Sequence, residues 1–317
     1  MKKFSELFKK AGGKEVLKQY WRAHVLLLAI LETFLLGISK KSLEIVRLVG
    51  YHKILCRLRR RYKKFINAYL INYPNDMKRE QSKKVWICWL QGMENAPQLV
   101  QKCYRSLVEN LQDKEIILLT ENNYRDYVQF PKYIQEKIDK GIITRTHMSD
   151  LLRLELLINY GGTWIDSTVY CSGKNYPKYM FESDLFVFQD LKPGLDGHAT
   201  CISSWFMSAC TNHPILLLTR ELLYKYWSKK TYMVDYFLLH DFFQLAIETY
   251  PEEWNNVIPF SNSVPHILLL RLFEQYDENI WCSTKAMTCF HKMTYKFEKE
   301  KTCIENTYYK QIFGGTN

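Results

Sequence analysis

The sequence of 317 residues contains nine cysteines, an odd number, but no Cys-x-x-Cys pair. Neither a zinc framework nor a disulfide scaffold is therefore indicated, and the reducing cytoplasm is the simplest compartment to expect. Internal repeats and low-complexity tracts are also absent from the sequence. The length suits one large α/β domain with an appendage.

A long hydrophobic run is missing as well. The most apolar stretches are residues 25–31 and 34–36, which are separated by Glu32 and followed by Lys40 and Lys41. A membrane-spanning helix needs about 20 apolar residues, so this segment is too short to span. It has no small-residue cleavage pattern and lies too far along the chain for a simple signal peptide.

The positive charge is concentrated at one end of the chain. Residues 1–64 contain 17 Lys and Arg against 4 Glu, a charge of +13, so the rest carries −2 of the total of +11. We expect residues 1–80 to form a basic helical region that lies on the anionic, cytoplasmic face of the plasma membrane as a peripheral segment. A helical cap on the rest of the chain, or a contact within a homo-oligomer, is the alternative. Nucleic acid is not expected as a partner, because no aromatic-interleaved motif accompanies the charge.

The remainder of the chain has the pattern of an α/β domain. A polar, proline-containing stretch at residues 72–84 predicts a linker, with the domain occupying residues 81–317. Residues 84–89 and 115–120 are predicted strands with a helix at 99–111 between them, which is the opening of a parallel α/β unit. A further strand at 184–188 and helices at 215–227 and 236–250 follow.

Residues 146–169 are the most informative segment. Ser149 and Asp150 suit the start of a helix, and Gly161 suits its end. Asp150 and Arg153 are three residues apart, so they share a helix face and can pair or address a ligand together. Residues 163–169 form a predicted strand that places Asp166 near its carboxyl end, where ligands bind in open α/β sheets. We expect a nucleotide-sugar site here; a buried ion-pair network is the alternative.

Four ordered motifs resemble a known family. They are WICWLQG at 86–92 with Ala96-Pro97, SDLLR at 149–153, YGGTWID at 160–166 and HKMTYK at 291–296. Together they cover roughly residues 84–300 and resemble bacterial capsular polysaccharide synthesis proteins related to glycosyltransferase family 32. The resemblance implies an α/β GT-A fold, Rossmann-like, with N-terminal and C-terminal helical additions. It also implies sugar transfer from a nucleotide donor with retention at the anomeric carbon.

The resemblance assigns roles to particular residues. Trp89 and Gln91 would border the base and ribose, although Trp89 also suits a packed core. The carboxylate of Asp150 would accept hydrogen bonds from sugar hydroxyls, Arg153 would face the sugar or diphosphate, and Lys296 would meet the diphosphate. Such cations stabilise a leaving UDP.

The resemblance also implies a metal ion, Mn²⁺ or Mg²⁺, held by Asp166, Thr168 and His291. The usual Asp-x-Asp motif of such enzymes is Asp166-Ser167-Thr168 here. Because these cations prefer carboxylate oxygens, one missing carboxylate should weaken binding by the protein alone. The donor diphosphate would then supply charge.

Retention of configuration at the anomeric carbon requires either a nucleophilic side chain on the face opposite the leaving group or attack of the acceptor on the same face. Asp241 or Asp235 could act as a nucleophile in a double displacement, whereas the family favours front-face attack. The expected activity is transfer of a hexose, galactose before glucose, from a UDP-sugar to an undecaprenyl-pyrophosphate-linked saccharide in capsule repeat-unit synthesis. A toxin-like transferase that modifies proteins, or an inactive membrane-bound scaffold, is the alternative.

Overall fold

The computed structural model describes residues 13–73, 77–191 and 202–314. Residues 74–76 of the predicted linker and Cys201 lie outside the described residues. The chain divides into two compact units. The helical unit comprises residues 1–75, 131–148 and 218–249, and the sheet unit comprises 76–130, 149–217 and 250–317. Residues 131–148 and 218–249 are thus grouped with the N-terminal helices, and the expected domain boundary near residue 80 stays a prediction.

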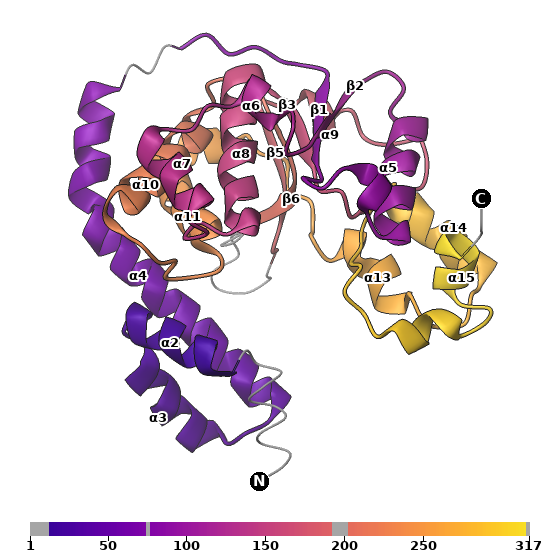
Figure 1. Cartoon of the computed structure of the whole chain (residues 1–317), viewed down its shortest axis with the longest axis horizontal. Coiled ribbons are helices and arrows are strands. Elements are labelled where there is room, and N and C mark those ends of the chain that lie inside the picture. Colours follow the sequence, from indigo (N-terminus) through magenta and orange to yellow (C-terminus); the bar gives the residue numbers. More distant parts are fainter. Residues whose placement is uncertain (1–12, 74–76, 192–201, 315–317) are drawn as a thin grey trace. The chain divides into compact units, whose positions relative to one another are not determined.

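The sheet unit is built on five strands in the order β2-β1-β3-β6-β5 (Figure 1). Their bounds are β1 Lys84–Cys88, β2 Glu115–Leu119, β3 Gly162–Ile165, β5 Leu185–Gln189 and β6 Ile202–Ala209. β1 pairs in parallel with β2, as expected, and also with β3, whereas β6 is antiparallel to both β3 and β5. The fold is therefore α/β with a mixed central sheet.

One face of this sheet is covered by an apolar core. Side chains of β1, β3, β5 and β6 pack there with residues of α5 (Gln98–Asn110), α9 (Tyr179–Glu182) and the short strand β7 (Phe290–Lys292). Phe206 lies 5.0 Å from Phe290 and 5.5 Å from Phe181 between ring centroids. Such fully buried aromatic side chains contribute much of a core's stability.

The turn between α8 (Arg145–Tyr160) and β3 needs two glycines. Gly161 and Gly162 have φ angles of 64° and 92°, a region that favours glycine. A Cβ atom at Gly162 would lie 2.3 Å from the Lys84 carbonyl oxygen of the neighbouring strand. The Trp86 indole donates a hydrogen bond of 2.9 Å to the Gly161 carbonyl. The glycine pair thus lets α8 turn directly into the sheet.

A second, two-stranded sheet pairs β4 (Val169–Cys171) with β7 in antiparallel register, Tyr170 opposite His291. Val169 and Phe290 belong to the core under the large sheet, whereas Tyr170 packs in a second cluster with Trp281 and Phe313. The remaining short elements of the sheet unit are η1 Met93–Asn95, α6 Tyr124–Tyr127, α12 Pro251–Asn255, η2 Val264–His266, α13 Ile267–Arg271, α14 Glu278–Met287, η3 Lys299–Cys303 and α15 Tyr308–Phe313.

The helical unit is organised around one long helix. Its helices are α2 Gly13–Ala23, α3 Leu26–Leu36, α4 Lys40–Asn72, α7 Lys132–Asp139, α11 Leu238–Thr249 and residues 218–229 of α10 (Pro214–Lys229). Buried residues recur at every fourth position of α4: Val46, Gly50, Ile54, Leu58 and Tyr62. This row faces its neighbours, and the Tyr62 ring lies 5.0 Å from Phe242 of α11.

Two local signals direct the chain into and out of α3. His24 has a φ angle of 56°, and the amides of His24 and Val25 donate to the carbonyls of Trp21 and Tyr20, the pattern of a Schellman motif that ends α2. Ser39 accepts a hydrogen bond from the Ser42 amide and so caps α4. In the described part of the chain, no helix is both long and apolar enough to cross a membrane.

Candidate functional site

The carboxyl ends of β1, β2 and β3 meet at one edge of the large sheet because the three strands are parallel. Trp89 and Gln91 follow β1, Glu121 follows β2 and Asp166 follows β3. The loops are joined by backbone hydrogen bonds of 2.9 Å, from the Trp89 amide to Leu119 and from the Glu121 amide to Leu90. The segments chosen from the sequence thus converge on the edge where α/β proteins bind ligands.

A buried arginine lies between two carboxylates at this edge. The Arg153 Nη2 atom is 3.4 Å from the Asp150 carboxylate and 3.6 Å from the Asp166 carboxylate, and the Arg153 side chain is 5% exposed. Its Nη1 atom donates to the Ser204 carbonyl at 2.6 Å. The Trp164 indole donates to Asp166 at 3.0 Å. The pairing of Asp150 with Arg153 that their spacing predicts is present, and Asp166 joins it.

Lys292, which sequence reasoning did not single out, completes this cluster. Its ammonium lies 3.3 Å from Asp166 Oδ2 and donates a hydrogen bond of 2.5 Å to the Thr168 hydroxyl. Two acidic and two basic side chains therefore converge, with Asp166 in contact with both cations. The sequence does contain a signal for Lys292. The residue lies next to His291 in the motif at 291–296, and successive residues of a strand point to opposite faces, so only one of the two can face Asp166.

His291 accordingly lies on the other face of β7. Its Nε2 atom is 2.9 Å from the Ser172 hydroxyl, and its ring is 5.2 Å from the Trp281 ring. Burial lowers the pKa of His291 to about 3, so the imidazole is neutral at physiological pH. The structure thus brings Thr168 to Asp166, but it places His291 among aromatic side chains instead.

Three other predicted residues lie at the loops of the edge. Trp89 contacts Tyr295 edge to face, with 5.6 Å between ring centroids. The Lys296 ammonium is 5.9 Å from the same Tyr295 ring, and Lys296 is exposed. Gln91 is exposed too, and its carbonyl accepts a hydrogen bond of 3.0 Å from Asn95. The loop after β7 therefore meets the loop after β1, with Tyr295 as the contact.

The residues of the cluster do not fit a divalent cation held by protein alone. Within the described residues, no group of three or more His, Cys, Asp or Glu side chains could hold a metal ion. Asp166 supplies one carboxylate, and the Lys292 ammonium already occupies contact distance from both Asp166 and Thr168. A cation there would need this ammonium to move and further oxygen ligands to come from a bound molecule.

Asp241 belongs to the helical unit, unlike Asp150 and Asp166. It is 9% exposed in α11. Burial, and next the Asp235 carboxylate, raise the pKa of Asp241 well above its usual range, and burial raises the pKa of Asp235 to about 6. A carboxyl group that is held protonated is a poor nucleophile, so this environment does not favour the predicted role of Asp241 in a double displacement.

Fold and site together define an α/β protein with a charged cluster at the carboxyl edge of its parallel strands, where α/β proteins bind ligands. The chain belongs to a family described as capsular polysaccharide synthesis protein, which matches residues 38–312.

Two curated relatives match part of the chain. The O-glycosyltransferase braB of Annulohypoxylon truncatum is 28% identical over 167 residues, 47% of this chain and 38% of the relative. The O-glycosyltransferase PaGT of Phomopsis amygdali is 24% identical over 169 residues, 48% of this chain and 40% of the relative. The matched part thus spans about two fifths of each relative's length.

Among solved structures, the PaToxG glycosyltransferase aligns with 82% of this chain and 95% of its own length, at 15% identity and a TM-score of 0.37. A likeness this weak carries no argument about function.

The pH dependence of stability tests the environment of Asp241. An aspartate whose pKa is higher in the folded than in the unfolded state makes stability fall as pH rises from about 4 through the folded-state pKa. Asp241→Asn removes this loss of stability, so the free energy of unfolding should be higher than that of the unaltered protein at pH 7.5 and little changed at pH 4.5. Urea unfolding at both pH values measures it.

The exposed Asp126→Asn variant is the control, for which no pH-dependent difference is expected. If Asp241→Asn instead lowered stability equally at both pH values, the carboxyl would be a hydrogen-bonded structural group and not a buried acid.

Proposed function

We propose that the chain is a glycosyltransferase that uses a UDP-sugar as donor. The observation that carries this proposal is the cluster of Asp150, Arg153, Asp166 and Lys292 at the carboxyl edge of the parallel strands. Family membership and the names of the two O-glycosyltransferase relatives support it.

The acidic and the basic side chains of the cluster suit different parts of a nucleotide sugar. Ionised carboxylates accept hydrogen bonds, which suits Asp150 and Asp166 to hydroxyl groups of the ribose or donor sugar. Lys292 and Arg153 place positive charge where the diphosphate gains negative charge as its bond to the anomeric carbon breaks. The acceptor hydroxyl forms the new bond to that carbon and passes its proton to the departing phosphate. Attack from the same face keeps the configuration of the sugar.

The finer assignments are part of the same proposal. The transferred sugar is a hexose, galactose before glucose, and the acceptor is a saccharide on undecaprenyl pyrophosphate in capsule repeat-unit synthesis. An inactive scaffold is the competing function, because Thr168 replaces a carboxylate and hydrogen-bonds to Lys292. Slow hydrolysis of UDP-sugars without acceptor separates the two, since a scaffold does not hydrolyse them.

Asp166→Asn tests the cluster. The substitution keeps the shape and the hydrogen bond from Trp164 but removes the charge that balances Arg153 and Lys292. We expect turnover of the UDP-sugar to fall roughly a hundredfold or more, the size typical of a lost electrostatic contribution at such sites. Initial rates of UDP release measure it, with Asp126→Asn as the control. Near-normal turnover by Asp166→Asn with an unchanged melting temperature would remove Asp166 from the mechanism.

Binding of Mn²⁺ or Mg²⁺ stays a prediction, because the side chains of the cluster alone supply too few oxygen ligands for such a cation. We expect calorimetry to detect weak Mn²⁺ binding without nucleotide and much tighter binding with UDP, whose phosphate oxygens complete the shell. Lys292→Gln should strengthen Mn²⁺ binding without UDP, because the competing ammonium is removed. Lys299→Gln, which alters an exposed lysine, is the matched control. Full transfer activity in excess chelator would show instead that the cation is dispensable.

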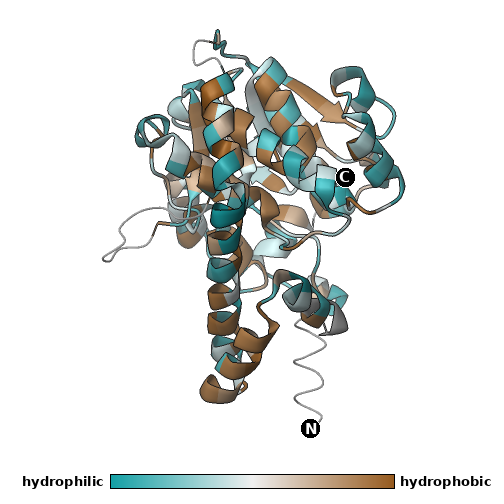
Figure 2. Cartoon of the chain, turned by 90° about the vertical axis from the view of Figure 1, so that its left-hand side faces the viewer, coloured by the Kyte–Doolittle hydropathy of each residue, from teal (hydrophilic) through white to brown (hydrophobic). Residues whose placement is uncertain are grey.

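The helical unit supports the proposed place at a membrane surface. One face of α3 is exposed and apolar, with Leu27 82% and Phe34 84% exposed. Most residues of α3 are hydrophobic, as the brown helical turns in Figure 2 show. Leu27, Ile30, Leu31, Phe34 and Leu35 are spaced as residues of one helix face. Together with the basic charge of residues 1–64, this face suits shallow insertion into an anionic leaflet.

Point substitutions test the membrane contact without disturbing α4, which packs on α11. Leu27→Gln with Phe34→Gln should lower binding to vesicles of phosphatidylcholine and phosphatidylserine about tenfold or more, because each apolar side chain buried contributes about 1.5–3 kcal/mol. Cosedimentation measures it. Leu70→Gln with Ile71→Gln, two exposed apolar residues near the other end of α4, is the matched control. Equal losses in both variants would contradict a specific role of α3.

A further inference from the structure

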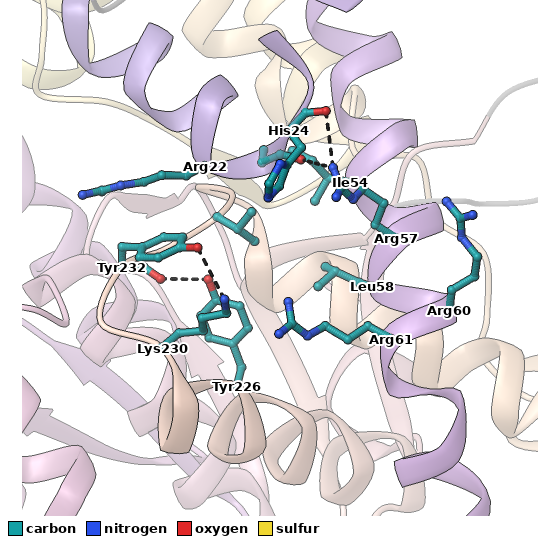
Figure 3. Close-up of a pocket in the computed structure, with 12 residues that line it drawn as sticks. Arg22, His24, Ile54, Arg57, Leu58, Arg60, Arg61, Tyr226, Lys230 and Tyr232 are labelled. Carbon is teal, nitrogen blue, oxygen red and sulfur yellow. Dashed lines mark hydrogen bonds between the residues drawn. The ribbon is translucent and has the colours of Figure 1, made fainter. Parts of the chain in front are cut away.

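A cavity of about 540 Å³ lies inside the helical unit. The end of α2, one side of α4 and the segment after α10 line it (Figure 3). Its walls include five basic side chains from three parts of the sequence: Arg22, Arg57, Arg60, Arg61 and Lys230. Among the residues that the structure describes, no acidic side chain lines it. All of these residues belong to one compact unit.

The five cavity cations have no counterion among the described residues. Among the described residues, no carboxylate lies within ion-pair distance of any of the five. By contrast, Arg59 on the same helix forms two hydrogen bonds of 2.5 and 2.7 Å to Glu248. Gathering like charges without a counterion is unfavourable, so an anion in the cavity would relieve the repulsion.

Neighbouring groups contact three of the cavity cations. Arg57 Nη1 donates to the Ala23 carbonyl at 2.8 Å and to the His24 carbonyl at 3.3 Å, which neutralises the negative end of α2. The Tyr232 ring lies 4.7 Å from the Arg22 guanidinium carbon and 5.3 Å from the Lys230 ammonium.

The Tyr226 hydroxyl holds the segment that carries Tyr232. It donates to the Tyr232 carbonyl at 2.8 Å. Figure 3 shows the Arg61 guanidinium directed toward Tyr226 and Lys230. Arg61 and Lys230 therefore face the same space from opposite walls, an arrangement that suits a phosphate group.

The position of the cavity along the chain indicates the source of the anion. His24 lines the cavity, and the exposed apolar face of α3 begins three residues later, at Leu27. A membrane lipid likewise has a phosphate group next to its hydrocarbon tail. A lipid tail that lies along α3 would thus bring the lipid phosphate to the arginines of the cavity.

We propose that this cavity binds the terminal phosphate or diphosphate of a membrane lipid. The inference rests on the membrane location in the proposed function but not on sugar transfer. The arrangement of cations suits a phosphoryl group and not negative charge alone. The site should therefore bind a lipid with a terminal phosphate more tightly than a lipid of equal charge whose phosphate is esterified on both sides.

Vesicle binding by the full chain tests the cavity. Phosphatidylcholine vesicles carry polyprenyl diphosphate, phosphatidic acid or phosphatidylserine at matched surface charge, and cosedimentation gives the bound fraction. We expect the first two to bind at least fivefold more protein than phosphatidylserine. Arg61→Gln with Lys230→Gln should abolish this preference, and Arg61→Lys with Lys230→Arg should retain most of it.

Lys63→Gln with Lys64→Gln removes two charges from the same helix outside the cavity and is the matched control; it should keep the preference. Equal binding to all three lipids, or the same loss in both Gln pairs, would overturn the site in favour of general surface charge. Inorganic pyrophosphate is titrated without vesicles in parallel. Binding of pyrophosphate as tight as that of the lipid would assign the cavity to a soluble phosphate and overturn the lipid assignment.

Melting temperatures of all variants verify their folding. UDP-sugar hydrolysis by the unaltered protein is a separate measurement. If that hydrolysis is absent while the lipid preference persists, the proposed transfer fails and the lipid site stands.

Discussion

The sheet unit depends on one interaction, the buried Arg153 guanidinium between Asp150 and Asp166. It joins α8, the end of β3 and, through the Ser204 carbonyl, β6. A buried charge is costly unless it is paired, and loss of either partner would leave the other uncompensated. The same constraint fixes two carboxylates at the edge of the sheet where α/β proteins bind ligands. Structural stability and the proposed donor site therefore rest on the same side chains.

Lys292 changes the electrostatics expected of such a site. A divalent cation would bring two positive charges to Asp166, whereas the structure already supplies two, one from Arg153 and one from Lys292. The hydroxyl of Thr168 suits this arrangement, because it accepts a hydrogen bond from the ammonium without adding negative charge. The hydroxyl at position 168 in place of a carboxylate thus agrees with the presence of the Lys292 ammonium beside it.

The two units differ in the surfaces that they present. The sheet unit gathers balanced charges at a sheet edge. The helical unit, by contrast, carries excess positive charge, an apolar helix face on α3 and a cavity of unpaired cations. Lipid surfaces combine apolar and anionic groups in the same way, so the helical unit suits a lipid and the sheet unit suits a sugar nucleotide.

The sequence by itself determined the local features. Hydrophobic pattern and capping residues gave the ranges of β1, β2, α5 and α11 to within a few residues, and the spacing of Asp150 and Arg153 predicted their pairing, because these signals act over one or two turns. Only the tertiary structure decided that β6 runs antiparallel, that residues 131–148 and 218–249 join the N-terminal helices, and that Lys292 rather than His291 reaches Asp166. Arg61 and Lys230 line the same cavity, although 169 positions separate them in the sequence. Such contacts follow from packing of the whole chain, which local periodicity does not encode.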